Sequence, residues 1–233
     1  MHQINIDLEI IFPGKWHSGS GEGGFLTDRL VRLDSRKKPY VPASTLRGVV
    51  REQCERLSRT LGLPDCSNPH SRDAGWHQPW SDLRSPVDQL FGTKCVSSTL
   101  FFQDARMDEG LLFPTMTISR TAMYRALGTG RDKHLFQTEY ANPAVLHTKI
   151  RGWHQELTAM DEKSLPIAYV LLLLALQSVD RLGGDKSTGK GSCELQVKNV
   201  VYNQQAWSWE AWAGNIQENL ELWDMYMEEG EGI

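Results

Sequence analysis

The chain has 233 residues, 40% of them hydrophobic, which is enough to bury one sizeable core. Its longest apolar run, Ile167 to Leu176, has only about half of the ~20 residues that a membrane-spanning helix needs. The N-terminal residues lack the basic start and apolar stretch of a secretion signal, and the four cysteines form no CxxC pair. We therefore expect one cytoplasmic domain with reduced thiols and no membrane partner.

The net charge of −4 hides an uneven distribution. Residues 201–233 carry seven acidic side chains and no Lys or Arg, so the other 200 residues carry 25 basic and 22 acidic ones. Between residues 25 and 51, seven basic side chains accompany only two acidic ones, Asp28 and Asp34. Phosphate binding depends on such local positive potential rather than on the charge of the whole chain. The charge therefore permits a nucleic-acid partner, although an ordinary solvated surface also carries such clusters.

The first predicted element is a strand over residues 3–11. Its apolar residues alternate with polar ones, the period-two pattern of a half-buried strand; they are Ile4, Ile6, Leu8 and Ile10. A glycine-rich stretch, residues 17–24, follows it, and the basic segment comes next.

A helix is predicted to begin at Pro42-Ala43-Ser44, with Ser44 as its N-cap, and to end before Gly62 and Pro64. Apolar residues recur at helical spacing along it, namely Leu46, Val50, Cys54, Leu57 and Leu61. A helix start rich in hydroxyl groups suits an anion, and Arg47 and Arg51 add charge on one helical face. We expect Ser44, Thr45, Arg47 and Arg51 to contact a phosphate backbone, the alternative being an ordinary capped helix.

Residues 64–86 are polar and aperiodic, which predicts a long loop or insertion. Cys66, His70 and His77, with Cys95 as a fourth ligand, have the chemistry of a zinc site. Their spacing fits zinc-finger patterns poorly, so a polar surface insertion is the preferred interpretation.

The second half of the core is predicted from four segments. Residues 100–102 favour a strand, residues 117–143 a protruding hairpin broken at Gly128, and residues 167–182 a helix that ends at Gly183. A last strand over 192–202 places Cys193, Leu195 and Val197 on one face. This order predicts an α+β fold, with a ferredoxin-like (RRM-like) core and long insertions.

We therefore predict a single domain over residues 1–233. Its core comprises about 3–63, 87–120 and 141–202, with an insertion at 64–86, a thumb-like hairpin at 121–140 and an acidic, Trp-rich tail at 203–233. For the tail, local packing is the preferred interpretation and a docking surface for a neighbouring subunit is the alternative.

Several motifs occur together in this chain. The first is the His17-Ser18-Gly19-Ser20-Gly21 stretch with Pro42-Ala43-Ser44-Thr45-Leu46-Arg47-Gly48 after it, and the second is the loop Gly183-Gly184-Asp185-Lys186-Ser187-Thr188-Gly189-Lys190-Gly191. Between them lie Leu90-Phe91-Gly92, Asp104-Ala105 and Arg120-Thr121. Over residues 3–200 the combination resembles the RAMP superfamily, and within it the backbone subunits of type III CRISPR effector complexes. Ala43, Thr45, Arg47 and Thr188 stand where that family usually has Gly, Ser, Lys and Arg.

The resemblance implies where RNA binds. It assigns guide-RNA contacts to the first loop, at His17, Gly19 and Gly21, although a lone histidine near a strand end is also often structural. The second loop implies contacts through Gly184, Lys186, Ser187, Gly189 and Lys190, where backbone amides approach the RNA closely. In the family the thumb wedges between bases, and the candidates here are Met123, Tyr124 and Leu127.

The resemblance also implies a metal-dependent endoribonuclease in which a loop aspartate acts on the target RNA. Asp28 lies at the matching point, fourteen residues before Pro42, where it would recruit Mg²⁺ or Mn²⁺ or orient the ribose 2′-hydroxyl, with Arg29 and Arg32 holding phosphates. Asp34 is the rival. An aspartate among arginines is also commonly just a salt-bridge partner.

The expected function is that of a guide-RNA-binding backbone subunit of a type III interference complex, which cleaves complementary target RNA at regular intervals. Its partners would be CRISPR guide RNA, single-stranded target RNA, copies of itself and other effector-complex subunits. One alternative is a non-catalytic structural backbone subunit. Another is a CRISPR-repeat-processing endoribonuclease, which would use a histidine and no metal.

Overall fold

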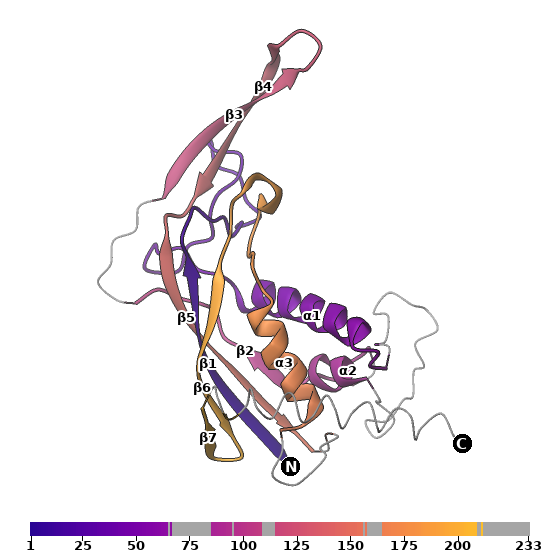
Figure 1. The fold of residues 1–233 in the computed structure, drawn as a ribbon. Helices are drawn as coiled ribbons and strands as arrows, with labels where there is room; N and C mark the ends of the chain where they lie inside the picture. Colours follow the sequence, from indigo (N-terminus) through magenta and orange to yellow (C-terminus); the bar gives the residue numbers. More distant parts are fainter. Residues whose placement is uncertain are drawn as a thin grey trace.

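A computed structural model describes residues 1–64, 66, 85–94, 96–108, 115–155, 157, 165–208 and 211 (Figure 1). Its elements are β1 (His2–Phe12), α1 (Ala43–Thr60), α2 (Pro86–Phe91), β2 (Leu100–Phe102), β3 (Met116–Tyr124), β4 (Thr129–Tyr140), β5 (Ala144–His154), α3 (Ile167–Gln177), the short 3₁₀ helix η2 (Lys186–Thr188), β6 (Glu194–Tyr202) and β7 (Gln205–Trp207). The α+β class is confirmed. None of these described helices is long and apolar enough to cross a bilayer.

The core sheet has five strands in the order β2-β5-β1-β6-β7, and each neighbouring pair is antiparallel. β1 is the middle strand, and its even-numbered apolar residues from Ile4 to Phe12 are all buried, as the alternation predicts. The helices cover one face of the sheet (Figure 1). The other face carries the alternate, more exposed residues of β1 and β5.

The helices bury themselves to different extents. α1 presents only a stripe to the core, with Leu46, Val50 and Cys54 buried. In α3, nine of the eleven residues are buried, because it packs against α1, α2 and β6. It ends at Gln177, five residues before the predicted end. The residues that follow it bond to the segment before β6: Leu182 donates its N–H to the Gly191 carbonyl oxygen, and Cys193 donates its N–H to that of Asp180.

Two strands differ from the prediction. β5 was not predicted as a separate element, although its burial alternates strictly from Ala144 to His154. In β6, a bulge opposite Asp7 and Leu8 moves the buried positions from Leu195 to Val200 and Tyr202, so the predicted single face holds only for part of the strand.

β3 and β4 form a separate two-stranded sheet that projects from one end of the core (Figure 1). The pair begins where Met116 lies opposite Tyr140, so this hairpin starts five residues before the predicted boundary at 121. After β4, residues 141–143 lead into β5, so the base of the hairpin adjoins the core sheet.

Candidate nucleic-acid interface

The two glycine-rich segments lie against each other. We call residues 15–41 the first loop and residues 183–191 the glycine loop. Gly184 donates its backbone N–H to the His17 carbonyl oxygen at 2.7 Å, and Gly191 donates to the Lys15 carbonyl oxygen at 2.9 Å. At Gly183, where φ is +91°, a Cβ would lie 2.3 Å from the His17 carbonyl oxygen, so this approach requires glycine.

Asp185 connects three segments. Its carboxylate accepts a 2.9 Å hydrogen bond from the Arg29 guanidinium in the first loop, and a second from the Tyr140 hydroxyl at the end of β4. The Arg120 guanidinium, on β3, lies 3.4 Å from the same carboxylate. The first loop, the glycine loop and both strands of the hairpin therefore meet at one acidic side chain.

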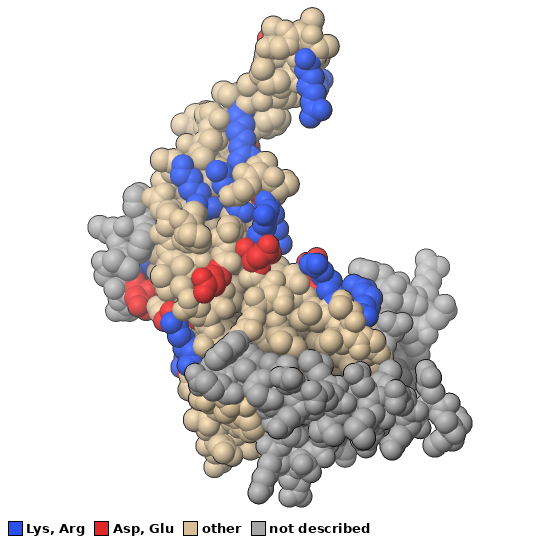
Figure 2. Space-filling model, in the orientation of Figure 1, with Lys and Arg blue, Asp and Glu red and all other residues tan. Residues whose placement is uncertain are grey.

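The groups around Asp185 shift one another's pKa values. Burial alone would raise the pKa of the Asp185 carboxyl, but the Tyr140 hydroxyl and the Arg29 guanidinium hold it below its usual value. Burial and the bond to Asp185 raise the pKa of Tyr140. Lys190 and Arg120 lie over the Tyr140 ring, 5.9 and 5.4 Å from its centroid. Figure 2 shows basic side chains gathered on the hairpin and around its base, a distribution that attracts a polyanion.

The proposed catalytic residue, Asp28, is exposed beside the hairpin. Its carboxylate accepts the backbone N–H of Gln137 on β4 at 2.7 Å, and its own N–H donates to the Gln137 carbonyl oxygen. Arg29 and Arg32, expected to hold phosphates, are engaged with Asp185 and with the Ser20 carbonyl oxygen.

Asp34 has a local structural role. Its carboxylate accepts the backbone N–H groups of Arg36 and Lys38 and lies 3.6 Å from the Arg106 guanidinium. This geometry agrees with the view of Asp34 as a partner for nearby groups rather than a catalyst.

Among the described residues, no group of three or more His, Cys, Asp or Glu side chains could hold a metal ion. Asp28 contributes a single carboxylate, and one of its oxygens already accepts the Gln137 N–H. Of the four residues in the zinc hypothesis, only Cys66 is described; His70, His77 and Cys95 lie outside the described residues.

The first loop presents its residues unequally. His17 is buried, and its Nδ1 lies 2.7 Å from the Glu139 carbonyl oxygen, so its ring contributes to the packing between the loop and β4. Gly19 and Gly21 are exposed, and a Cβ at Gly21 would meet open space. RNA contact by these residues stays a prediction, and for His17 the structural alternative fits its burial.

The start of α1 differs from the prediction. The N-cap position is Pro42, and Asp104 supplies the cap instead of Ser44: its carboxylate accepts the Ala43 N–H at 2.9 Å. Ser44 is exposed. Among the described residues, no hydrogen bond or ion pair joins Ser44 or Thr45 to the glycine loop, and RNA contact by the start of this helix stays a prediction.

The basic residues of α1 have partners within the protein. Arg47 donates to the Phe91 carbonyl oxygen at 2.7 Å and lies over the Phe91 ring, while Arg51 pairs with Glu55 at 2.8 Å. Both guanidinium groups therefore already have partners within the protein, which leaves less of each group open to a phosphate. A role in RNA binding stays a prediction for both arginines.

The hairpin carries exposed apolar side chains away from the core. Met123, Tyr124 and Leu127, predicted as wedge residues, are exposed, and Arg131 lies over the Tyr124 ring at 5.8 Å. Sequence reasoning missed the exposed Leu135 and Phe136 on the opposite strand. It also assigned no role to Arg120, Tyr140 or Asp185, which only the fold brings together.

The rest of the glycine loop is accessible. Ser187 and Gly189 are exposed and Lys186 and Lys190 half-buried, with Lys186 in the 3₁₀ turn. Gly189 has a φ of +76° and open space where a Cβ would stand. Backbone groups of this turn are therefore within reach of a ligand.

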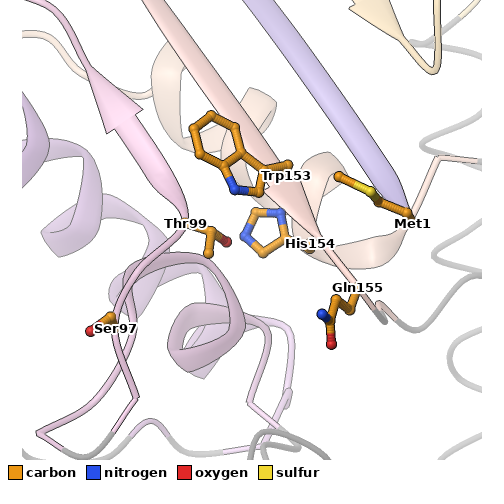
Figure 3. A pocket seen from close by; sticks show the side chains of 6 residues that line it. All are labelled: Met1, Ser97, Thr99, Trp153, His154 and Gln155. Carbon is orange, nitrogen blue, oxygen red and sulfur yellow. The ribbon is translucent and has the colours of Figure 1, made fainter.

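A separate hollow of about 340 Å³ lies at the other end of the sheet (Figure 3). It is lined by Met1, Ser97, Thr99, Trp153, His154 and Gln155, which include none of the predicted site residues. His154 is buried, with its Nδ1 2.7 Å from the Tyr169 hydroxyl, and burial lowers its pKa to about 4.

The sequence matches the model of a known protein family. The model of the RAMP superfamily matches residues 9–194, which contain the first loop, the hairpin and the glycine loop. No curated protein matches the chain significantly. Because this match covers most of its length, the chain belongs to the RAMP superfamily.

Proposed function

We propose that this chain is a guide-RNA-binding backbone subunit of a type III CRISPR interference complex, which cleaves complementary target RNA at regular intervals. Membership of the RAMP superfamily indicates a CRISPR-associated RNA-binding subunit. The observation that carries the proposal further is the meeting of the first loop, the glycine loop and the hairpin base at Asp185, with Arg29, Arg120 and Lys190 around it.

The fold supports the proposal. Leaving out the hairpin, α2 and β7, the elements run strand, helix, strand, strand, helix, strand, and the strands lie in the order β2-β5-β1-β6. This order is the one expected of a ferredoxin-like core, which we propose for this chain. The hairpin is an insertion between its second and third strands, where it can reach over a bound RNA strand.

RNA binding would use two kinds of contact. The glycine loop offers backbone groups near Gly189 together with Lys186 and Lys190 to the sugar–phosphate chain. The exposed apolar residues of the hairpin, Met123, Tyr124 and Leu127, would insert between bases. Neither contact reads sequence, as befits a protein that holds a guide of variable sequence.

Cleavage would take place at Asp28. Its carboxylate would accept the proton of a ribose 2′-hydroxyl while the 2′-oxygen attacks the adjacent phosphorus. The 5′-oxygen of the next nucleotide would leave and take up a proton from water, giving a 2′,3′-cyclic phosphate and a 5′-hydroxyl. A divalent ion bound by Asp28 and phosphate would stabilise the charge on the phosphoryl oxygens.

The experiment is target cleavage by the purified complex carrying Asp28→Ala, compared with Asp34→Ala and with Glu52→Ala as an exposed acidic control on α1. We expect Asp28→Ala to abolish cutting while guide binding and assembly persist, and Glu52→Ala to cut normally. Normal cutting by Asp28→Ala would remove it as the catalyst. A wild-type complex that binds guide and never cuts would favour the non-catalytic subunit.

Repeat processing is the remaining alternative. It predicts cutting of repeat RNA that survives EDTA and depends on His17. The burial of His17 weighs against it, because a general acid or base must reach the RNA.

A further inference from the structure

An exposed aromatic pair lies on the sheet, far from the hairpin. The rings of Phe101, on β2, and Trp153, on β5, are stacked with centroids 4.7 Å apart and an interplanar angle of 19°. Phe101 is 49% exposed and Trp153 43% exposed. Two large aromatic side chains that are stacked on each other and open to solvent form an apolar patch of the kind that often contacts a partner.

The pair faces away from the helices. Phe101 lies opposite Arg151 in the β2–β5 register, and Trp153 is two residues further along β5, so all three share a face. Their neighbours Leu100 and Gly152 point the other way and are buried. The pair therefore belongs to the sheet face that the helices leave uncovered.

The surroundings of the pair are basic and amide-rich. Arg151 is exposed and has no ion-pair or hydrogen-bond partner among the side chains that the structure describes. On β1, Gln3 and Asn5 lie opposite Trp153 and Arg151. The first acidic residue on β1 is Asp7, and Lys149 neutralises it at 3.1 Å.

We propose that Phe101 and Trp153 form a stacking platform for an unpaired nucleobase of single-stranded RNA, with Arg151 contacting the adjacent phosphate. Every base has an aromatic face, so stacking on a flat ring pair tolerates any sequence. A guanidinium beside the rings supplies charge complementarity to the backbone, and amide side chains can bond to base edges. This combination favours RNA over an apolar protein segment, which would not need Arg151.

The platform is a second contact site and rests on the proposed RNA-binding function. Trp153 is nine residues along β5 from Ala144, where the hairpin joins the sheet, or roughly 30 Å at the rise of a strand. The hollow of Figure 3 opens beside Trp153, whose indole forms part of its wall together with Thr99 and His154. A base stacked on Trp153 would therefore have room at the rim.

The test is fluorescence anisotropy with a labelled single-stranded RNA of 30 nucleotides and with the same RNA annealed to its complement. Wild type is compared with Trp153→Ala, Trp153→Phe and Val145→Ala, a control that is 43% exposed at the other end of β5. We expect Trp153→Ala to bind the single strand about tenfold more weakly, as for the loss of one stacked base. Trp153→Phe and Val145→Ala should bind nearly as wild type, and the duplex should not distinguish any of the variants.

Two results would overturn the platform and leave the proposed function intact. One is equal affinity of Trp153→Ala, Val145→Ala and wild type for the single strand. The other is a change in self-association of RNA-free Trp153→Ala by sedimentation velocity, with unchanged RNA affinity, which would assign the pair to a contact between copies. If wild type itself binds no single-stranded RNA, the proposed function fails together with the platform.

Discussion

The Tyr140 hydroxyl donates a hydrogen bond to the Asp185 carboxylate, which fastens the end of β4 to the glycine loop. Tyr140 is fully buried, and its partner is ionised, so the bond is of the stronger kind. We predict that Tyr140→Phe lowers the free energy of unfolding by about 1–3 kcal/mol, measured by urea denaturation. An unchanged midpoint would show that the bond does not hold the hairpin base.

The exposed Tyr124→Phe variant is the matched control for this prediction. Tyr124 carries the same hydroxyl near the tip of the hairpin, where it is exposed. Its substitution should change stability by less than about 0.5 kcal/mol.

His154 should make stability depend on pH. Burial, with a smaller contribution from the nearby His2, lowers the pKa of His154 to about 4 from about 6.5. Between about pH 6.5 and 4, the unfolded chain therefore binds a proton at this histidine that the folded protein does not. The contribution of His154 to stability is fully present above about pH 6.5 and is lost as the pH decreases toward 4. His154→Gln should flatten the decrease in melting temperature over this range, whereas His134→Gln on the hairpin should leave it unchanged. A profile that His154→Gln does not alter would contradict the assignment.

Substitutions at two glycines of the glycine loop can distinguish the cost of a left-handed backbone from the cost of a steric clash. Gly189 and Gly191 have φ values of +76° and +70°, but only at Gly191 would a Cβ collide, 2.1 Å from the Leu182 carbonyl oxygen. We predict that Gly189→Ala costs about 1–2 kcal/mol of stability, the penalty of a left-handed alanine. Gly191→Ala should cost clearly more stability when both variants are compared by thermal denaturation. Equal losses would contradict the close contact between Gly191 and Leu182.

The N-terminal cap of α1 can be tested by replacing Asp104 and Ser44 separately with alanine. Because Asp104 accepts the Ala43 N–H, Asp104→Ala should destabilise the protein by about 0.5–2 kcal/mol. Ser44→Ala should be nearly neutral, since Ser44 makes no capping bond. If chemical denaturation shows a larger loss of stability for Ser44→Ala than for Asp104→Ala, then Ser44 is the cap, as the sequence suggested.

The capping of α1 by Asp104 rather than by Ser44 is a feature that the sequence alone does not reveal. Local patterns placed β1, α1, β2, the hairpin and β6 to within a few residues, because alternation and helical spacing are properties of neighbouring residues. The alternation of β5 carried the same signal and could have been recognised. The cap from Asp104 comes from sixty-one residues away, and no local pattern indicates it.

The site was predictable in the same uneven way. The glycine loop was recognisable in part because Gly183 and Gly191 approach the backbone of His17 and Leu182 too closely for any other residue. The role of Asp185 was not, because its partners Arg29, Arg120 and Tyr140 come from three separate segments. The burial of His17 likewise follows from the packing of β4 against the first loop.

The most direct test of the account is to purify the chain with its neighbouring subunits and sequence the RNA that accompanies it. We predict short RNAs with a common 5′ tag, and their loss when Arg120→Glu and Lys190→Glu reverse the charge beside Tyr140. A complex that assembles without RNA, or carries cellular RNA with no shared 5′ end, would contradict the central claim.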